Sequence, residues 1–230
     1  NGAMRLKLDH PAAIEGRSIH RKRVFDPKDY TGNVLKPVSS NKKLGNGSSF
    51  ITKGEWRHMP MFSLTLEERA TCPRTCHHWQ DCYGNNTAFA HRFQAGPELE
   101  TRLQAEIAQL AFRYPRGFVV RLHVLGDFYS PEYVQLWATL LRTYPSLRIF
   151  GYTARSGDFI AADIALMNLT FRDRCWIRTS MREPNGKQLI ATEIPGPDSI
   201  TCPQQTGKTA SCLTCGLCWA APKPIHFVNH

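Results

Sequence analysis

The chain has 230 residues, of which 42% are hydrophobic and 10% aromatic, and this composition excludes an intrinsically disordered protein. No apolar run approaches the roughly 18 residues that a membrane-spanning helix needs, so we expect no contact with a membrane. The formal net charge of +10 permits binding of nucleic acid or another polyanion to a basic surface. The chain begins without the charged and apolar regions of an export signal, so the cytoplasm is the expected location.

Residues 1–54 are predicted to form an irregular, basic N-terminal arm. They include the basic run His20–Arg23, and they show no sustained hydrophobic period of two or of 3.6 residues. We therefore expect extended or looped backbone with at most short strands. Two further regions are predicted: a barrel-like region over residues 55–200, and a cysteine-rich segment over residues 201–230 that binds a cluster and completes the same domain.

From residue 59 onward, apolar runs typical of strands alternate with helical patterns. Ser130 and Pro131, for example, form a typical helix start, since serine caps a helix and proline suits its first turn. The alternation predicts an α/β fold in which parallel strands form a partial (β/α) barrel, with a doubly wound sheet as the alternative. The predicted strands are at 59–66, 118–125, 147–152, 175–180, 189–193 and 225–228, and the predicted helices at 86–93, 97–114, 130–141 and 158–167.

The eight cysteines are the most informative residues, because all but Cys175 fall into two compact sets. In a reducing cytoplasm, clustered thiols are metal ligands or catalytic groups more often than disulfides. Cys175 begins an apolar strand, so we expect it to be a buried and inert thiol.

The C-terminal set contains Cys212, Cys215 and Cys218, each three positions after the last, with Cys202 as a fourth thiol. This tight spacing is typical of iron–sulfur binding by a looping backbone, whereas structural zinc more often uses two separated pairs. The spacing therefore favours a [4Fe–4S] cluster, with zinc as the alternative.

The first set, Cys72, Cys76 and Cys82, has the spacing C-x3-C-x5-C directly after a predicted strand. Three thiolate ligands leave one iron of a four-iron cluster open to a substrate or cofactor. Cys202, His77 and His78 are all candidates for a fourth ligand. The spacing leaves open whether the seven cysteines form one shared site or two, and zinc is again the alternative metal.

Polar residues follow several of the predicted strands and are candidates for binding a cofactor. In parallel α/β folds the loops after the strands gather at one edge, so these residues are expected on one rim with the first cysteine set. His123 could be a core histidine or a catalytic one, and Asp127 could cap a helix or hold a ligand. The cofactor-binding candidates are Gly126, Asp127, Arg155 and Arg178.

A strand, a three-cysteine loop and then a helix resemble the start of the radical S-adenosylmethionine enzymes, whose usual spacing is C-x3-C-x2-C. In that superfamily the second strand ends in a glycine-rich acidic turn, and Leu125–Phe128 stands at the corresponding place here. The resemblance implies that a [4Fe–4S] cluster binds S-adenosylmethionine, and that the four cofactor-binding candidates position it. The third cysteine departs from the usual spacing.

The chain also resembles a family of phage-encoded proteins of unknown function. This resemblance implies a protein that acts in the cytoplasm of the host cell, and it implies no particular activity. The matching stretches are Lys43–Gly45, Ser63–Glu68, Cys82–Asn86, His123–Ser130 and Cys202–Trp219.

Three functions thus remain open from the sequence. The leading prediction is an iron–sulfur protein with a radical-S-adenosylmethionine-like fold and one or two [4Fe–4S] clusters, which would be an enzyme of unknown substrate. One alternative is a nucleic-acid-binding protein with structural zinc, favoured by the positive charge. The other is a redox or electron-transfer iron–sulfur protein with no catalysis of its own.

Overall fold

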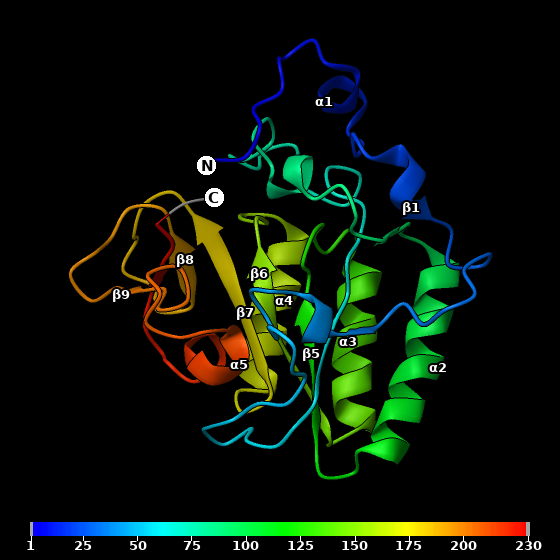
Figure 1. Cartoon of the computed structure of the whole chain (residues 1–230), viewed down its shortest axis with the longest axis vertical. Helices are drawn as coiled ribbons and strands as arrows, with labels where there is room; N and C mark the ends of the chain where they lie inside the picture. The colour runs from blue at the N-terminus through cyan, green and yellow to red at the C-terminus, as the bar shows by residue number, and fades with distance from the viewer. Residues whose placement is uncertain (1, 229–230) are drawn as a thin grey trace.

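The structure is a computed structural model that describes residues 2–228. Its helices are α1 (Pro11–Glu15), α2 (Pro97–Arg113), α3 (Pro131–Thr143), α4 (Phe159–Thr170) and α5 (Cys212–Cys215). Its strands are β1 (Val24–Phe25), β2 (Lys36–Pro37), β3 (Met61–Ser63), β4 (Arg92–Phe93), β5 (Phe118–Leu122), β6 (Leu147–Thr153), β7 (Cys175–Met181), β8 (Ile190–Thr192), β9 (Ile200–Thr201) and β10 (Ile225–His226). Figure 1 shows the helices α2, α3 and α4 beside a twisted central sheet.

The central sheet has eight strands in the order β2-β3-β5-β6-β7-β8-β10-β9. The edge strand β2 is antiparallel to β3, and every other neighbouring pair is parallel. This confirms the predicted α/β class and the parallel pairing. Within residues 2–228 no pairing joins β9 to β2, so the sheet is open and not a closed barrel.

One face of the sheet packs against α2, α3 and α4. Alternate residues of the strands point to this face, which is the expected consequence of the two-residue period of a strand. On β5, for example, Phe118, Val120 and Leu122 contribute to this core, and Trp137 of α3 is fully buried against them. The three predicted strand–loop–helix units from residue 59 are therefore present, and they place every one of these helices on the same side.

The opposite face is covered by irregular chain from both ends of the sequence. Val119 and Phe150 point to this side, where they pack with Val38, Trp56 and Trp219 in a second core. The rings of Trp56 and Trp219 stack with centroids 5.8 Å apart. In Figure 1 the cyan segment and the orange α5 lie in front of the sheet and supply this cover. Residues 38–56, named here the inner strap, are thus part of the folded core.

Two helix starts follow the predicted physical rules. The Ser130 hydroxyl accepts a hydrogen bond from the Tyr133 N–H at 3.1 Å, and an Asp158 carboxylate oxygen accepts one from the Ala161 N–H at 2.8 Å. Each cap satisfies a backbone donor that a helix would otherwise leave unpaired. Among the helices of the described chain, none combines the length and the apolar character needed to cross a bilayer.

The predicted helix over residues 86–93 is wrong. The segment begins with a short 3₁₀ turn, Tyr83–Asn86, and ends in β4, which pairs with β1 in parallel with Val24 opposite Arg92. The pairing partner lies far away in the sequence, and the Arg92 guanidinium is buried in a long-range polar network. The hydrophobic period of the segment itself reveals neither the distant strand partner nor the buried polar network.

Candidate metal centres at the two cysteine sets

The first cysteine set lies on the loop between β3 and β4, at the carboxyl end of the parallel strands. Thr71 attaches this loop to the turn after β5, because its hydroxyl accepts a hydrogen bond from the Asp127 N–H at 3.0 Å. All three thiols are free and partly buried. The structure therefore confirms that this loop lies at the edge of the sheet where the parallel strands end.

The thiols of this first set affect one another electrostatically. Burial raises the pKa of the Cys72 thiol, and the charges of Asp127, Cys82 and Cys76 act in the same direction. Burial likewise raises the pKa of Cys82 to about 11. Three adjacent thiolates would repel one another in this environment, so a bound cation would be needed to hold them all deprotonated.

Backbone N–H groups point at some of these sulfur atoms. The amide of His78 hydrogen-bonds to the Cys76 thiol, and the amide of Gly84 to the Cys82 thiol. In both cases the donor lies two residues after the cysteine. Such donors stabilise a thiolate and tune the metal that it binds.

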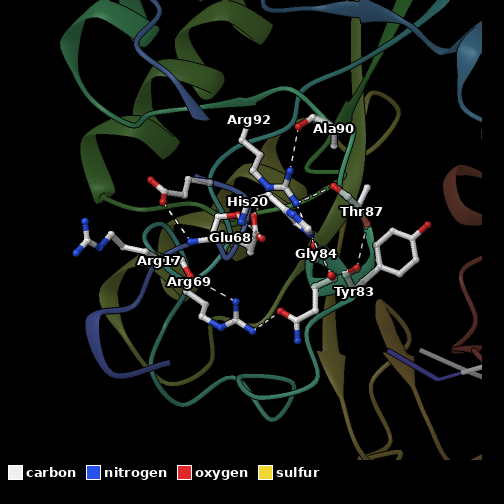
Figure 2. A network of polar contacts seen from close by, with 12 residues as sticks. Arg17, His20, Glu68, Arg69, Tyr83, Gly84, Thr87, Ala90 and Arg92 are labelled. Carbon is white, nitrogen blue, oxygen red and sulfur yellow. Dashed lines mark hydrogen bonds and ion pairs between the residues drawn. The ribbon is translucent and has the colours of Figure 1, made fainter. Parts of the chain in front are cut away.

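A buried ion pair fixes the loop from behind (Figure 2). The Arg92 Nε lies 2.6 Å from a Glu68 carboxylate oxygen, and both side chains are 0% exposed. The same guanidinium donates to the carbonyl oxygens of Gly84 and Thr87, at 3.0 Å each. Since Gly84 follows Cys82 by two positions, this pair sets the position of the loop's last cysteine.

The N-terminal residues close the same network. The Ser18 hydroxyl donates to Glu68 at 2.9 Å, and His20 contacts the Asn85 carbonyl oxygen at 3.0 Å. Arg69 donates to the Asn85 side chain at 2.7 Å and to the Trp79 carbonyl oxygen at 2.8 Å, as Figure 2 shows in part. A Cβ on Gly84 would lie 2.6 Å from the Glu68 carboxylate, so only glycine fits there.

The cofactor-binding candidates Gly126, Asp127 and Arg155 lie next to this loop, but internal contacts engage their polar groups. The Asp127 carboxylate accepts hydrogen bonds from the N–H groups of Phe128 and Ala154 and from the Thr153 hydroxyl, at 2.7 to 2.8 Å. Burial raises its pKa to about 6. These contacts tie the loop after β5 to the loop after β6.

Arg155 connects the same loops, since it donates to the carbonyl oxygens of Phe128 at 3.0 Å and Thr71 at 3.2 Å. Gly126 has a φ of +83°, and a Cβ there would lie 2.6 Å from Thr71 and Leu66. The fourth candidate, Arg178, lies elsewhere, on the side of the sheet that faces α5. The structure thus brings three of the four candidates together.

The two loop histidines, predicted as candidates for a fourth cluster ligand, both face Glu193. His78 Nε2 lies 2.6 Å from a Glu193 carboxylate oxygen, and His77 Nε2 lies 3.6 Å from the same atom. Cys202, the third candidate, lies with the C-terminal set. The structure therefore groups the seven cysteines as three and four.

The four thiols of the C-terminal set line one small cavity. Its walls come from the end of β9, from α5 and from the following 3₁₀ turn Leu217–Trp219, and its sulfur-bearing residues are Cys202, Cys212, Cys215 and Cys218. Burial raises the pKa of Cys212 to about 12, and neighbouring Cys218 adds to the shift. This convergence on one cavity is the arrangement that a metal or cluster with four thiolate ligands requires.

Two local devices orient these thiols. Ser211 and Thr214 form a capping box at the start of α5, and Gly216 takes a left-handed φ of 76° directly after it. The sharp turn brings Cys218 back toward Cys212 and Cys215. In addition, the Leu217 amide hydrogen-bonds to the Cys215 thiol, again from two positions later.

Cationic and hydroxyl groups of the sheet lie beneath this cavity. The Tyr152 hydroxyl donates to the Cys218 sulfur at 2.7 Å. The fully buried Arg178 donates to the carbonyl oxygens of Cys218 at 3.2 Å and Lys223 at 2.7 Å. The Arg121 guanidinium lies 4.7 Å from the centre of the Tyr152 ring. It also interacts electrostatically with Cys212 and Cys218. Two guanidinium groups thus offset negative charge at the thiols.

His123 and Cys175 are both part of the core. His123 is buried, and its Nε2 hydrogen-bonds to the Tyr133 hydroxyl at 2.8 Å. Burial lowers the pKa of this histidine to about 3, so it is neutral in the folded protein at pH 7. The Cys175 thiol is buried and donates to the Asn168 side chain at 3.2 Å. The expected burial of this thiol is confirmed.

A comparison with protein families identifies a relationship. The family model described as Gene product 88 matches residues 33–221, which include all eight cysteines. The chain belongs to this family. The match agrees with the resemblance to phage-encoded proteins of unknown function. No curated protein matches the chain, and no solved structure matches it either.

Several residues at the candidate sites were not found from the sequence. Thr71 and Glu193 contact the loop of the first set, and Tyr152 and Arg121 lie at the C-terminal set, yet none of the four was predicted as a site residue. Arg121 and Tyr152 did carry a usable signal, because each is a polar residue inside an otherwise apolar strand. Thr71 and Glu193 carried none, since their roles depend on contacts between distant loops.

Proposed function

We propose that this protein is an iron–sulfur protein with two cluster sites of different kinds. Cys202, Cys212, Cys215 and Cys218 would hold a [4Fe–4S] cluster with a full set of thiolate ligands. Cys72, Cys76 and Cys82 would hold a second, with one iron free of cysteine. The observation that carries the proposal is the single cavity lined by the four C-terminal thiols.

The spacing of the thiols favours a cluster over zinc. A zinc ion bonds thiolates at about 2.3 Å, which holds tetrahedrally arranged sulfur atoms about 3.8 Å apart. Within residues 2–228, His77, His78 and Glu193 are the only three ligand-type side chains whose ligand atoms all lie within 4.8 Å of one another. The thiols of each set are therefore spread more widely, as around the larger body of a cluster.

The residues around the first set act by positioning and by exclusion of water. Thr71, Asp127 and Arg155 bind the loops after β3, β5 and β6 to one another, and the buried Glu68–Arg92 pair fixes the loop from behind. When bound, a cluster with an open iron supplies single electrons and can cleave S-adenosylmethionine, as the radical enzyme resemblance implies. In this proposal the three residues hold the site's shape, and the protein acts in the cytoplasm of the host cell.

The test is the metal content of anaerobically purified protein. We expect about eight iron and eight sulfide per chain, since each [4Fe–4S] cluster holds four of each. A colourless protein with stoichiometric zinc contradicts the proposal and favours the nucleic-acid-binding alternative. That alternative further requires binding to DNA or RNA that weakens steeply with salt.

The same sample decides whether the protein is an enzyme or an electron carrier. We expect S-adenosylmethionine to change the electron paramagnetic resonance spectrum of the reduced first cluster. An unchanged spectrum, with both clusters present, instead supports a redox or electron-transfer protein without catalysis of its own.

A further inference from the structure

Outside the two cysteine sets, His77, His78 and Glu193 converge at the end of β8. Their ligand atoms all lie within 4.8 Å of one another. The two histidines come from the first cysteine loop, whereas Glu193 directly follows β8. Both imidazole Nε2 atoms approach the same carboxylate oxygen, at 2.6 Å from His78 and 3.6 Å from His77.

The orientation of His78 is fixed from its other side. Its Nδ1 lies 3.2 Å from an Asp81 carboxylate oxygen, so its Nε2 is directed toward Glu193. Histidines that bind metals commonly use their second ring nitrogen in this way, in a carboxylate–histidine–metal arrangement. A plain hydrogen bond between His78 and Glu193 does not need Asp81 as a support, and it does not need a second histidine on the same oxygen.

Glu193 is also held in place. Its backbone carbonyl oxygen contacts Nε2 of His226 on β10 at 3.0 Å, which anchors the residue between two strands of the sheet. Among residues 2–228, the ion pair to its second carboxylate oxygen comes from Arg182 at 3.8 Å, on a side chain that is 77% exposed. An exposed guanidinium at this distance binds a carboxylate weakly. The carboxylate is therefore available as a ligand.

We propose that His77, His78 and Glu193 bind a divalent first-row transition metal ion at a site separate from both cysteine sets. Two imidazoles and one carboxylate suit such ions, including Zn²⁺, Co²⁺ and Fe²⁺. Metal bonds of about 2.1 Å would hold ligand atoms roughly 3 Å apart. His78 and Glu193 therefore move apart by less than about 1 Å to admit the ion.

The proposed ion has two consequences for the molecule. It joins the first cysteine loop to β8, two segments that are distant in the sequence. Three protein ligands also leave a coordination position open to water or a substrate. The side chains of His77, His78 and Glu193 are 28%, 19% and 28% exposed, so the site is reached from solvent.

The experiment is a titration with Co²⁺ of anaerobically purified protein whose cysteine sites are already filled. We expect one further equivalent to bind, with visible absorption of cobalt bound to nitrogen and oxygen and without a thiolate-to-cobalt charge-transfer band. Zn²⁺ should displace it. No uptake, or uptake with the thiolate band, would overturn the proposal.

Four variants test the ligands. We expect Asp81→Asn to lower the affinity for Co²⁺ about 10- to 100-fold, which is typical of the loss of a carboxylate that hydrogen-bonds to a metal-bound histidine. His78→Gln and Glu193→Gln should lower it further. The matched control is His58→Gln, at an exposed histidine, which should leave it unchanged. Equal affinity in all four variants would contradict the site.

The proposal does not depend on the nature of the cysteine sites. Iron content and thermal unfolding of each variant are measured in the same samples, and we expect both to match the unsubstituted protein. A protein that binds zinc at its cysteines would still be expected to take up Co²⁺ here. Failure of the iron–sulfur proposal and failure of this one are thus distinguishable.

Discussion

The two cysteine sets are built in opposite ways. Cys72, Cys76 and Cys82 come from one loop, which is held by residues packed behind it, chiefly the buried pair Glu68–Arg92. The four C-terminal thiols come from separate short elements, and side chains of the sheet hold them from beneath. The first set therefore depends on its own loop, whereas the second depends on the inner face of the sheet.

The two sets also differ in the number of their thiols and in the charged groups around them. The first set, on the loop, has three thiols, with the negative charge of Asp127 acting on Cys72 and the positive charge of Arg69 acting on Cys76 and Cys82. The C-terminal set has four thiols, with Arg121 and Arg178 nearby. Positive charge stabilises an anionic cluster with four thiolates, whereas a negative charge beside three thiolates makes the site depend on its cation. In the proposed function the loop set, with one thiolate fewer, is the one suited to exchange a ligand.

The largest expected effect is on iron content. Cys215→Ser should remove about half of the iron, that of the C-terminal cluster, and Cys76→Ser the other half, because in the proposed function each set holds its own cluster. Cys202→Ser should behave like Cys215→Ser, and Cys175→Ser should retain all iron. The measurement is iron and sulfide per chain. If Cys202→Ser instead removes the spectrum of the loop cluster, the division into three and four is wrong.

The next effect is on stability, at the support of the loop set. Glu68→Gln leaves the Arg92 guanidinium buried without its counter-charge, so we expect the free energy of unfolding to fall by about 3–5 kcal/mol. Chemical denaturation measures this.

The matched control for that experiment is Glu15→Gln, which removes exposed ion pairs to Arg17 and Arg21. We expect this variant to lose less than about 1 kcal/mol. A small loss at Glu68 as well would show that the buried pair does not hold the loop.

A smaller effect concerns pH, at a histidine that supports neither set directly. His123 has a folded pKa of about 3, below its ordinary value of 6.5, so the unfolded chain binds a proton that the folded chain does not. Its contribution to stability is complete above pH 6.5 and is lost as the pH falls. Between pH 7 and pH 5 we expect a loss of about 2 kcal/mol.

The comparison that isolates this effect is with His123→Gln, which keeps a partner for the Tyr133 hydroxyl but does not titrate. Unfolding of both proteins is followed at several pH values. The variant should lack this part of the pH dependence, and parallel curves would mean that His123 is not buried as a neutral ring.

The smallest expected effect is on the electronic properties of the C-terminal cluster. Tyr152→Phe removes the O–H···S hydrogen bond to Cys218. Loss of a donor destabilises the more negative, reduced state, so the reduction potential should fall by on the order of 50 mV, equivalent to about 1 kcal/mol. A redox titration monitored by electron paramagnetic resonance measures both clusters.

The control for Tyr152 is Tyr129→Phe, since the Tyr129 hydroxyl donates to Glu100 and not to a thiol. This variant should leave both potentials unchanged. If Tyr152→Phe instead shifts the reduction potential of the cluster at the first set, the hydroxyl does not act on the C-terminal cluster.

The sequence predicted those parts of the molecule that depend on neighbouring residues. The helices with Ser130 and Asp158 as caps and the apolar strands follow from local patterns, and the clustering of the thiols was visible from spacing alone. The predicted helix over 86–93 failed because Arg92 pairs with Val24 and Glu68 through contacts between distant segments.

The inner strap was unpredictable for the same reason, whereas Cys202 was expected either in the C-terminal set or as a fourth ligand of the first set. Val38 and Trp56 are buried although their segment has no strand or helix period, because they fill the space over one face of the sheet. The pairing of β9 with β10 helps to place Cys202 beside the other C-terminal thiols. The division into an N-terminal arm over residues 1–54, a barrel-like region over 55–200 and a C-terminal segment over 201–230 that completes the same domain stays a prediction. Part of the predicted arm, the inner strap, covers one face of the sheet.

The contacts between α5 and the inner strap have a consequence for biosynthesis. The Cys212 N–H donates to the Lys43 carbonyl oxygen at 2.9 Å, and the Leu213 N–H to that of Leu44 at 3.2 Å. An early segment of the chain is therefore completed by a late one, and a chain emerging from the ribosome leaves Val119 and Phe150 incompletely covered until α5 has been made. Such exposed apolar surface invites aggregation. The site of the four C-terminal cysteines is thus the last part of the core to close, and under the proposed function iron supply would govern the yield of folded protein as well as its colour.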